Sequence, residues 1–132
     1  MSDTQQLESL DHIPAEHMEQ IKAVAKMCHE TNRSYLSVMR DTVKPWGELE
    51  QQDKDNTIEQ VAFLILNPES KVSAWHDAWL AKMIVAGWKF GQKRSIKSKT
   101  HEQLKPFHHL PEKQQVKDAL FHTVVQQAIH AG

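Results

Sequence analysis

The apolar residues of this chain recur mostly at three- and four-residue steps, the spacing of one face of an α-helix. The first such stripe predicts a helix over about residues 14–38, with Pro14 at its first position. Asn32 interrupts the stripe, so one polar side chain is expected to point inward. The apolar residues expected on the buried face are Met18, Ile21, Ala25, Cys28, Tyr35 and Met39.

A second stripe predicts a helix that begins at about Lys54 or Asn56 and ends at about Leu66. Asn67 would terminate it, because a residue that precedes a proline is disfavoured in the helical region. Residues 41–52 are expected to form the loop before this helix, and that loop contains Trp46. The residues expected to be buried are Ile58, Val61, Ala62, Ile65 and Leu66.

Ser73 is a suitable N-cap for a third helix, and Gly87 is expected to end it in a left-handed conformation. Trp88 would then turn back across the helix. One side of this helix is expected to carry Trp75, Ala78, Trp79, Lys82, Met83 and Ala86. A last helix is expected to open with Pro111 at its first position and to bury Val116, Ala119, Leu120, Val124 and Ala128.

These elements predict a mainly α fold of the α+β class, with four principal helices in two similar halves. Short β segments are expected near Trp46 and near Trp88. A chain of 132 residues can bury one core without metal or disulfide staples, so residues 13–132 are expected to be a single domain. The polar residues 1–12 are expected to form a flexible tail.

Composition excludes several classes of partner. The formal net charge of −1 argues against affinity for nucleic acid polymers, which depends on an excess of basic residues. The longest apolar run, residues 61–66, is far shorter than the roughly 20 residues of a membrane helix, so no membrane partner is expected. The N-terminal residues do not resemble a signal peptide, and the single cysteine, Cys28, suits a reducing compartment. We therefore expect a cytoplasmic protein.

The charges are distributed unevenly along the chain. Residues 1–20 and 48–59 are acidic, whereas the segment after Trp88 is basic. That basic segment carries Lys89, Lys93, Arg94, Lys97, Lys99 and Lys105 against Glu102. Two interpretations stay open: solvated faces of opposite sign, or an anion site at the basic loop.

Motifs for metal binding and catalysis are absent from the sequence. Although there are nine histidines, none belongs to an H-E-x-x-H motif, and no C-x-x-C motif is present. There is no G-x-S-x-G elbow, and the four glycines form no phosphate-binding loop. Cys28 lies on an apolar stripe and is interpreted as a core residue. We expect no metal, no cofactor and no enzymatic activity.

Several short motifs, taken in order, carry a family resemblance. They are C-H-E-T-N-R from Cys28, Trp46, H-D-A-W from His76, G-W-K-F-G from Gly87, K-T-H from Lys99, L-K-P-F from Leu104 and K-D-A-L-F from Lys117. Their order and spacing resemble the ryanodine-receptor repeat domain in its stand-alone bacterial or phage form, over about residues 18–126. One departure is Glu102, which stands where the family usually has a proline after the histidine.

The resemblance implies a cytosolic module and not a channel pore. Bacterial relatives occur in settings that suggest ligand sensing, including nucleotide signals in antiphage defence. The channel repeats also carry kinase-targeted serines in their basic loops, and Lys93-Arg94-Ser95 resembles such a site. In a stand-alone domain of this kind, we interpret that match as a coincidence.

Two functional hypotheses follow. The first is a non-enzymatic module that senses or sequesters a small anionic, nucleotide-like molecule, with its base on Trp88 or Trp46 and its phosphate on Arg33. Aromatic faces, imidazoles and fixed cations suit such a ligand. The second is a structural or protein-interaction module, with a protein partner or a second copy and no small ligand. The candidate ligand-binding residues are His29, Asn32, Arg33, Trp46, His76, Trp79, Lys82, Trp88, Lys99 and His101.

Overall fold

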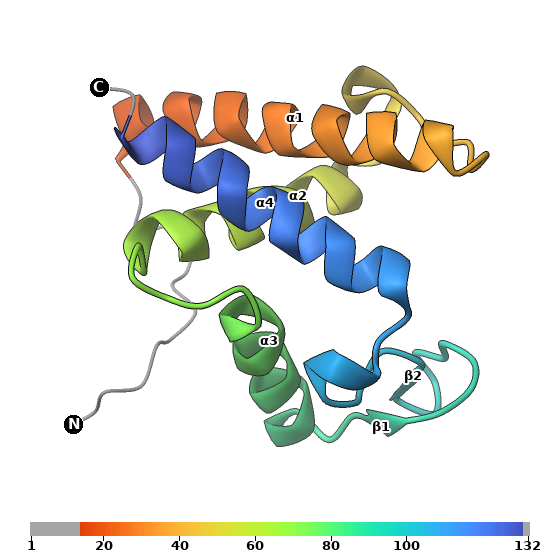
Figure 1. The fold of residues 1–132 in the computed structure, drawn as a ribbon. Helices are drawn as coiled ribbons and strands as arrows, with labels where there is room; N and C mark the ends of the chain where they lie inside the picture. The colour runs from red at the N-terminus through yellow and green to blue at the C-terminus, as the bar shows by residue number, and fades with distance from the viewer. Residues whose placement is uncertain (1–13, 131–132) are drawn as a thin grey trace.

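The computed structural model describes residues 14–130, so the expected tail at residues 1–12 lies outside the described residues. Four α-helices dominate this range, as predicted, and the mainly α fold class is confirmed (Figure 1). In chain order the elements are α1 (Ala15–Val38), η2 (Trp46–Glu48), α2 (Gln51–Leu66), α3 (Ala74–Val85), β1 (Lys89–Phe90), β2 (Thr100–His101), η3 (Phe107–His109) and α4 (Glu112–His130). Within residues 14–130, no helix has the length and apolar character needed to cross a bilayer.

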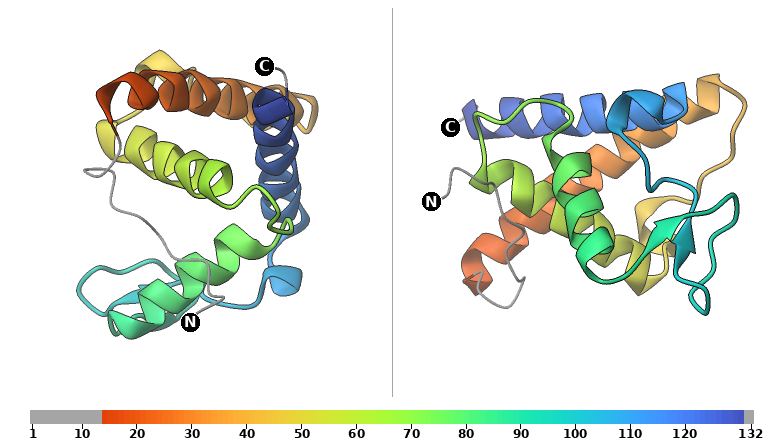
Figure 2. Two further views of the ribbon diagram at one scale, coloured as in Figure 1. Left: turned by 90° about the vertical axis from the view of Figure 1, so that its left-hand side faces the viewer. Right: turned by 90° about the horizontal axis from the view of Figure 1, so that it is seen from below.

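Helix α2 lies between α1 and α3, and α4 runs along both α1 and α2 (Figure 2). Helix α3, the two strands and η3 lie at the end of the molecule away from α1 (Figure 1). The strands pair in parallel, with Lys89 opposite Thr100 and Phe90 opposite His101. The main apolar core therefore forms among α1, α2 and α4, with the first residue of α3 at its border.

The central position of α2 explains its burial. Five consecutive residues, from Gln60 to Leu64, are buried, because neighbouring helices contact α2 on several sides. Ile58, Val61 and Ala62 are buried and Ile65 is partly buried, as predicted, but Leu66 at the end of the helix is exposed.

The first helix buries Ile21, Ala25 and Cys28, which confirms this part of the predicted stripe. The Cys28 thiol lies 3.9 Å from the carbonyl oxygen of Phe121 in α4, and burial raises the pKa of this thiol to about 12. Cys28 is thus a core residue, as expected. Met39 was expected on the buried face but is exposed, because it lies just beyond the end of α1.

The prediction of which face of α4 is buried is wrong. Its buried residues are Asp118, Phe121 and Val125, whereas the residues of the predicted stripe are only partly buried. Helix α4 packs against α1 and α2 through the face that carries the large Phe121 ring. The spacing of the apolar residues in the sequence does not by itself identify this face.

The end of α3 confirms the role predicted for Gly87, which has φ +93°. The amide of Trp88 donates to the Met83 carbonyl, and the amide of Gly87 donates to the Ile84 carbonyl. This pair of bonds is the Schellman motif, which requires a left-handed residue that glycine adopts without a Cβ penalty. The chain therefore turns at Gly87 and carries Trp88 away from the helix axis.

Several predicted boundaries need correction. Pro14 is the N-cap residue of α1, and Pro111 directly precedes α4; neither is the first helical residue. Ser73 occupies the N-cap position of α3, but its side chain makes no capping hydrogen bond. Helix α2 begins at Gln51, three residues before the earliest predicted start. Trp46 belongs to a 3₁₀ turn and not to a β segment, since η2 begins there.

Candidate functional site

A polar cavity of about 530 Å³ lies where α3 and β2 face α2 and α4. Four of the ten residues predicted as ligand-binding line this cavity: His76, Trp79, Lys82 and His101. The other lining residues include Glu59 and Gln60 of α2, Trp75 and Met83 of α3, Arg94 of the basic loop, and Lys117 and Asp118 of α4. Residues from widely separated parts of the chain therefore converge on one space.

His76 is held rigidly in the first turn of α3. Its side chain is buried, and Nε2 lies 2.7 Å from the carbonyl oxygen of Lys105. Because a carbonyl can only accept, Nε2 carries the proton of this hydrogen bond. The imidazole centroid lies 5.5 Å from the Trp79 ring and 6.4 Å from the Phe107 ring. The hydrogen bond and the ring contacts fix the orientation of His76.

His101, in β2, also contacts Trp79. Its ring packs edge-on against Trp79, with centroids 5.0 Å apart. Its Nδ1 accepts a hydrogen bond of 3.0 Å from the amide of Gln103, which requires an unprotonated Nδ1. Burial, followed by the positive charge of Arg94, lowers the pKa of His101 below its ordinary value of 6.5. A neutral imidazole is therefore favoured at this position.

Trp79 forms the aromatic centre of the cavity. It lies three residues after His76 in α3, so the two side chains share one helix face. The indole is partly buried, and the imidazoles of His76 and His101 both contact it. An aromatic surface that is positioned in this way and lines a cavity can stack against a planar ligand.

Three cations line the cavity together with Trp79. Lys82 Nζ lies 3.7 Å from Glu59, in an exposed and therefore weak ion pair. Arg94 donates a hydrogen bond of 2.9 Å to Glu102, and the ammonium of Lys117 lies 5.2 Å from the Phe121 ring centroid. The paired acids Glu59 and Glu102 leave both Lys82 and Arg94 partly accessible.

A buried polar pair, which the sequence analysis missed, lies on the cavity wall. Gln60 Nε2 donates a hydrogen bond of 3.0 Å to Asp118 Oδ1, although the two residues are 58 positions apart. Burial raises the pKa of Asp118, and Lys117 and the Gln60 bond partly oppose that shift. One signal was available: Gln60 is a polar residue beside the apolar run of residues 61–66.

His29, Arg33 and Trp46 form a separate group at α1 and the loop before α2. His29 Nε2 donates to the Lys44 carbonyl at 2.7 Å, and Arg33 Nε donates to the Val43 carbonyl at 3.1 Å. Glu30 accepts hydrogen bonds from both the Arg33 guanidinium and the Trp46 amide. The Trp46 amide, followed by the Arg33 guanidinium, lowers the pKa of Glu30. These contacts attach the loop to α1, and none of the three residues lines the polar cavity described above.

The three remaining predicted residues lie apart from the polar cavity as well. Asn32 is partly buried, and its Oδ1 has no hydrogen-bond partner among residues 14–130. Trp88 follows the Gly87 turn and is partly buried. Lys99 Nζ donates a hydrogen bond of 2.8 Å to the Ala86 carbonyl, so this cation binds the C-terminal end of α3.

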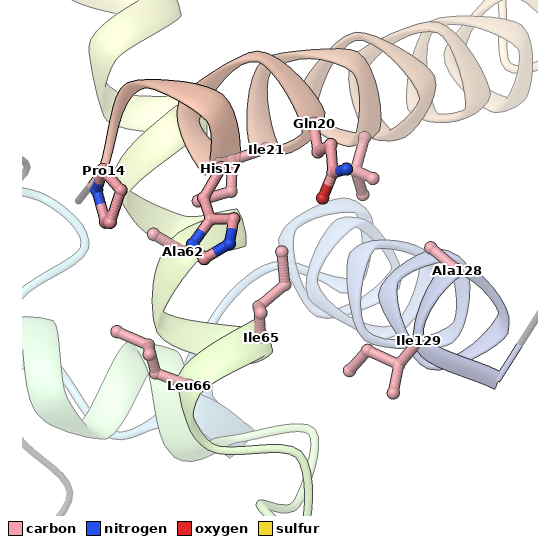
Figure 3. A pocket seen from close by; sticks show the side chains of 10 residues that line it. Pro14, His17, Gln20, Ile21, Ala62, Ile65, Leu66, Ala128 and Ile129 are labelled. Carbon is pink, nitrogen blue, oxygen red and sulfur yellow. The ribbon is translucent and has the colours of Figure 1, made fainter. Parts of the chain in front are cut away.

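A second, apolar cavity of about 650 Å³ lies at the other end of α2 (Figure 3). There the side chains of α1, α2 and α4 face one another, with Ile65 between His17 and Ile129 (Figure 3). The two cavities have no lining residue in common. The described residues contain no group of three or more histidine, cysteine, aspartate or glutamate side chains placed to hold a metal ion.

In the comparison with known protein families, residues 69–130 match the model of the RyR domain. This range begins just before α3 and extends to the end of α4, so it contains His76, Trp79, Lys82 and His101. It leaves α1 and α2 outside the match, although both belong to the same core. No curated protein matches the chain.

Proposed function

We propose that this chain, which belongs to the RyR-domain family, is a non-enzymatic module that binds a small anionic molecule in the polar cavity. The ligand carries a planar ring, as a nucleotide does. The observation that carries the proposal is the convergence of an indole, two imidazoles and three cations around one cavity.

The size of the cavity supports a ligand of this class. Small-molecule sites commonly measure about 300–1,000 Å³, and the polar cavity measures about 530 Å³. A planar ring would stack on Trp79 next to the imidazoles of His76 and His101, and stacking of a base on an aromatic side chain is worth about 1–3 kcal/mol.

The charges around the cavity support an anionic group on the ligand. Lys82, Arg94 and Lys117 are positive, whereas Glu59 and the Glu102 carboxylate paired with Arg94 are negative, and the raised pKa of Asp118 disfavours its ionised form. A phosphate would form charge-assisted hydrogen bonds with Arg94 or Lys82. The buried Gln60–Asp118 pair offers polar groups that could discriminate between planar rings.

The proposed contacts differ from those expected from the sequence. There, the base was expected on Trp88 or Trp46 and the phosphate on Arg33. Arg33 and Trp46 instead take part in the network around Glu30, so we assign the stacking to Trp79 and the anion contact to Arg94 and Lys82. A ligand role for the other predicted residues stays a prediction on which the proposal does not depend.

A nucleotide screen with two matched variants tests the proposal. Mono-, di- and cyclic nucleotides are screened by thermal shift, since a ligand at 100 times its Kd adds about 2.7 kcal/mol of stability. The best compound is then titrated into the wild-type protein, Arg94→Gln and Lys93→Gln. These variants lose the same charge at neighbouring positions of one loop, but only Arg94 lines the cavity.

We expect Arg94→Gln to weaken binding about tenfold or more, whereas Lys93→Gln changes it little, because a charge-assisted bond contributes more than a distant charge. An equal loss in both variants would indicate nonspecific attraction to the basic loop. If no nucleotide shifts the melting temperature, the proposal fails and the structural or protein-interaction alternative takes its place.

A further inference from the structure

A buried polar pair forms part of the wall of the polar cavity. Gln60 of α2 is 2% exposed and Asp118 of α4 is 6% exposed, and both line the cavity. Gln60 Nε2 donates a hydrogen bond of 3.0 Å to Asp118 Oδ1. Gln60 is also the first of five consecutive buried residues, of which the other four are apolar. Removing two polar groups from water in this way costs free energy unless their hydrogen bonds are satisfied.

The pair uses only part of its hydrogen-bonding capacity. Among residues 14–130, Asp118 Oδ2 accepts no hydrogen bond, and Gln60 Nε2 has a second hydrogen beyond the one donated to Oδ1. The buried side-chain atoms without a partner in this range belong to Asn32, Ser70 and Glu102, so Asp118 Oδ2 is not a fully enclosed atom. Since Asp118 lines the cavity, this oxygen is available to a molecule bound there.

The hydrogen-bonding groups follow one another in the order acceptor, acceptor, donor. Oδ2 and Oδ1 of an ionised Asp118 accept, and the Gln60 amide nitrogen beside Oδ1 donates through its second hydrogen. A ring edge that presents donor, donor and acceptor complements this order. Guanine has such an edge, formed by its amino group, its N1–H and its O6. Adenine instead places an unprotonated ring nitrogen at the central position, where it faces a carboxylate oxygen with no hydrogen between them.

Asp118 also lies near the aromatic surface on which a ring would stack. Burial raises the pKa of Asp118, whereas the nearby charges of Lys117 and His76 oppose that shift. The same His76 imidazole lies 5.5 Å from the Trp79 ring, so the carboxyl and the stacking surface have a neighbour in common. Hydrogen bonds from ring N–H groups would replace those that burial removes, and they would favour the ionised carboxyl.

We propose that Gln60 and Asp118 determine which ring the polar cavity accepts, and that its ligand is a nucleotide with a guanine-type edge. Asp118 accepts hydrogen bonds from the N1–H and the amino group of the ring, and Gln60 donates to O6. This inference rests on the proposed function and refines it. Trp79 stacks on any planar ring, whereas the polar pair distinguishes one ring edge from another.

A series of purine nucleotides, titrated into the wild-type protein by calorimetry, provides the first measurement. Guanosine, inosine and adenosine are compared as 5′-monophosphates and as 3′,5′-cyclic monophosphates, so that only the ring edge differs within each set. We expect the guanosine form to bind about tenfold more tightly than the inosine form, which lacks the amino group, and about 100-fold or more tightly than the adenosine form.

The series separates this inference from the proposed function. Equal or tighter binding of the adenosine form overturns the inference and leaves the proposed function standing. Binding by none of these compounds overturns the inference as well, and the wider nucleotide screen then decides the proposed function separately. Because the series uses the wild-type protein, its outcome does not depend on the folding of a variant.

The variant Asp118→Asn provides the second measurement. Asparagine keeps an oxygen for the Gln60 hydrogen bond and presents an N–H donor where Asp118 has Oδ2. It therefore matches xanthine, which carries an oxygen in place of the guanine amino group. We expect the variant to bind guanosine 5′-monophosphate about tenfold more weakly than the wild type does, and xanthosine 5′-monophosphate about tenfold more tightly.

Glu59→Gln is the matched control, because it removes one negative charge from another lining residue, next to Gln60 in the sequence. This variant should change the affinity for the guanosine and xanthosine nucleotides by a similar factor, since it acts on their phosphates. If Asp118→Asn also changes both affinities by a similar factor, Asp118 does not distinguish ring edges, and the role proposed for the pair is overturned.

Discussion

Two parts of the molecule differ in the interactions that stabilise each of them. The first part consists of α1, α2 and α4, and the second consists of α3, β1, β2 and η3. In the first part, Ala25, Val61 and Val125 are fully buried in one apolar core. In the second part, the His76 imidazole is hydrogen-bonded to the Lys105 carbonyl, and Trp79 contacts two imidazoles at the edge of a polar cavity. The interior of the first part is closed by dense apolar packing, whereas the boundary between the two parts holds a cavity lined by polar groups.

The difference has an energetic consequence. Residues of the three-helix core make contacts that no other group replaces after truncation, so their loss costs transfer and cavity energy. Residues at the polar cavity already adjoin open space, so truncation there removes less buried contact. Substitutions in the two parts should therefore separate stability from ligand binding.

The largest effect is expected for Phe121→Ala in the three-helix core. Phe121 is 1% exposed and belongs to the same core cluster as Cys28, so removal of its ring should cost about 3–5 kcal/mol of unfolding free energy. Chemical denaturation measures the loss. A loss of unfolding free energy below about 1 kcal/mol would contradict the conclusion that α4 packs into the core through the face that carries Phe121.

A smaller loss is expected for Trp79→Ala, at about 1–2 kcal/mol, because this indole is only partly buried and lines the polar cavity. The same denaturation experiment measures it, with Trp79→Phe as the control that keeps an aromatic ring. A loss as large as that of Phe121→Ala would show that Trp79 is a core residue, and the comparison between the two parts would then fail.

The smallest change in unfolding free energy is expected for Asp118→Asn, at the boundary between the two parts. Burial raises the folded-state pKa of Asp118 above its ordinary 3.8, so the folded state binds more protons than the unfolded state between these two values. Stability from this group is full below pH 3.8 and is lost as pH rises through the folded pKa, with a slope of at most about 1.4 kcal/mol per pH unit.

Asparagine keeps an oxygen that accepts the Gln60 hydrogen bond and carries no charge. The variant should therefore be as stable as the wild-type protein at pH 7, or slightly more stable, and it should lose this part of the pH dependence. Denaturation series between pH 4 and pH 7 compare the two proteins. A variant that is less stable than the wild type at pH 7 would show that the ionised carboxylate is itself a stabilising group.

Features that depend on neighbouring residues were predictable from the sequence. The stripe containing Ile21, Ala25 and Cys28 was recognised because helical periodicity is local. The left-handed turn at Gly87 was also predictable, since a glycine at the end of an apolar pattern meets a local steric requirement. His76 and Trp79 were placed on one face by their spacing alone, and the family resemblance came from the order of short motifs.

Features that depend on how the helices pack appeared only in the tertiary structure. Packing orients α4 so that Phe121 and Asp118 point inward, and it brings Asp118 to Gln60 across 58 residues of chain. Packing also separates the ten predicted site residues. Four of them line the polar cavity: His76, Trp79, Lys82 and His101. Three others belong to the hydrogen-bond network around Glu30 and the loop before α2: His29, Arg33 and Trp46. The physical reason is that a sequence pattern specifies which face of an element is apolar, whereas the partner of that face is selected by the shape and burial of the whole core.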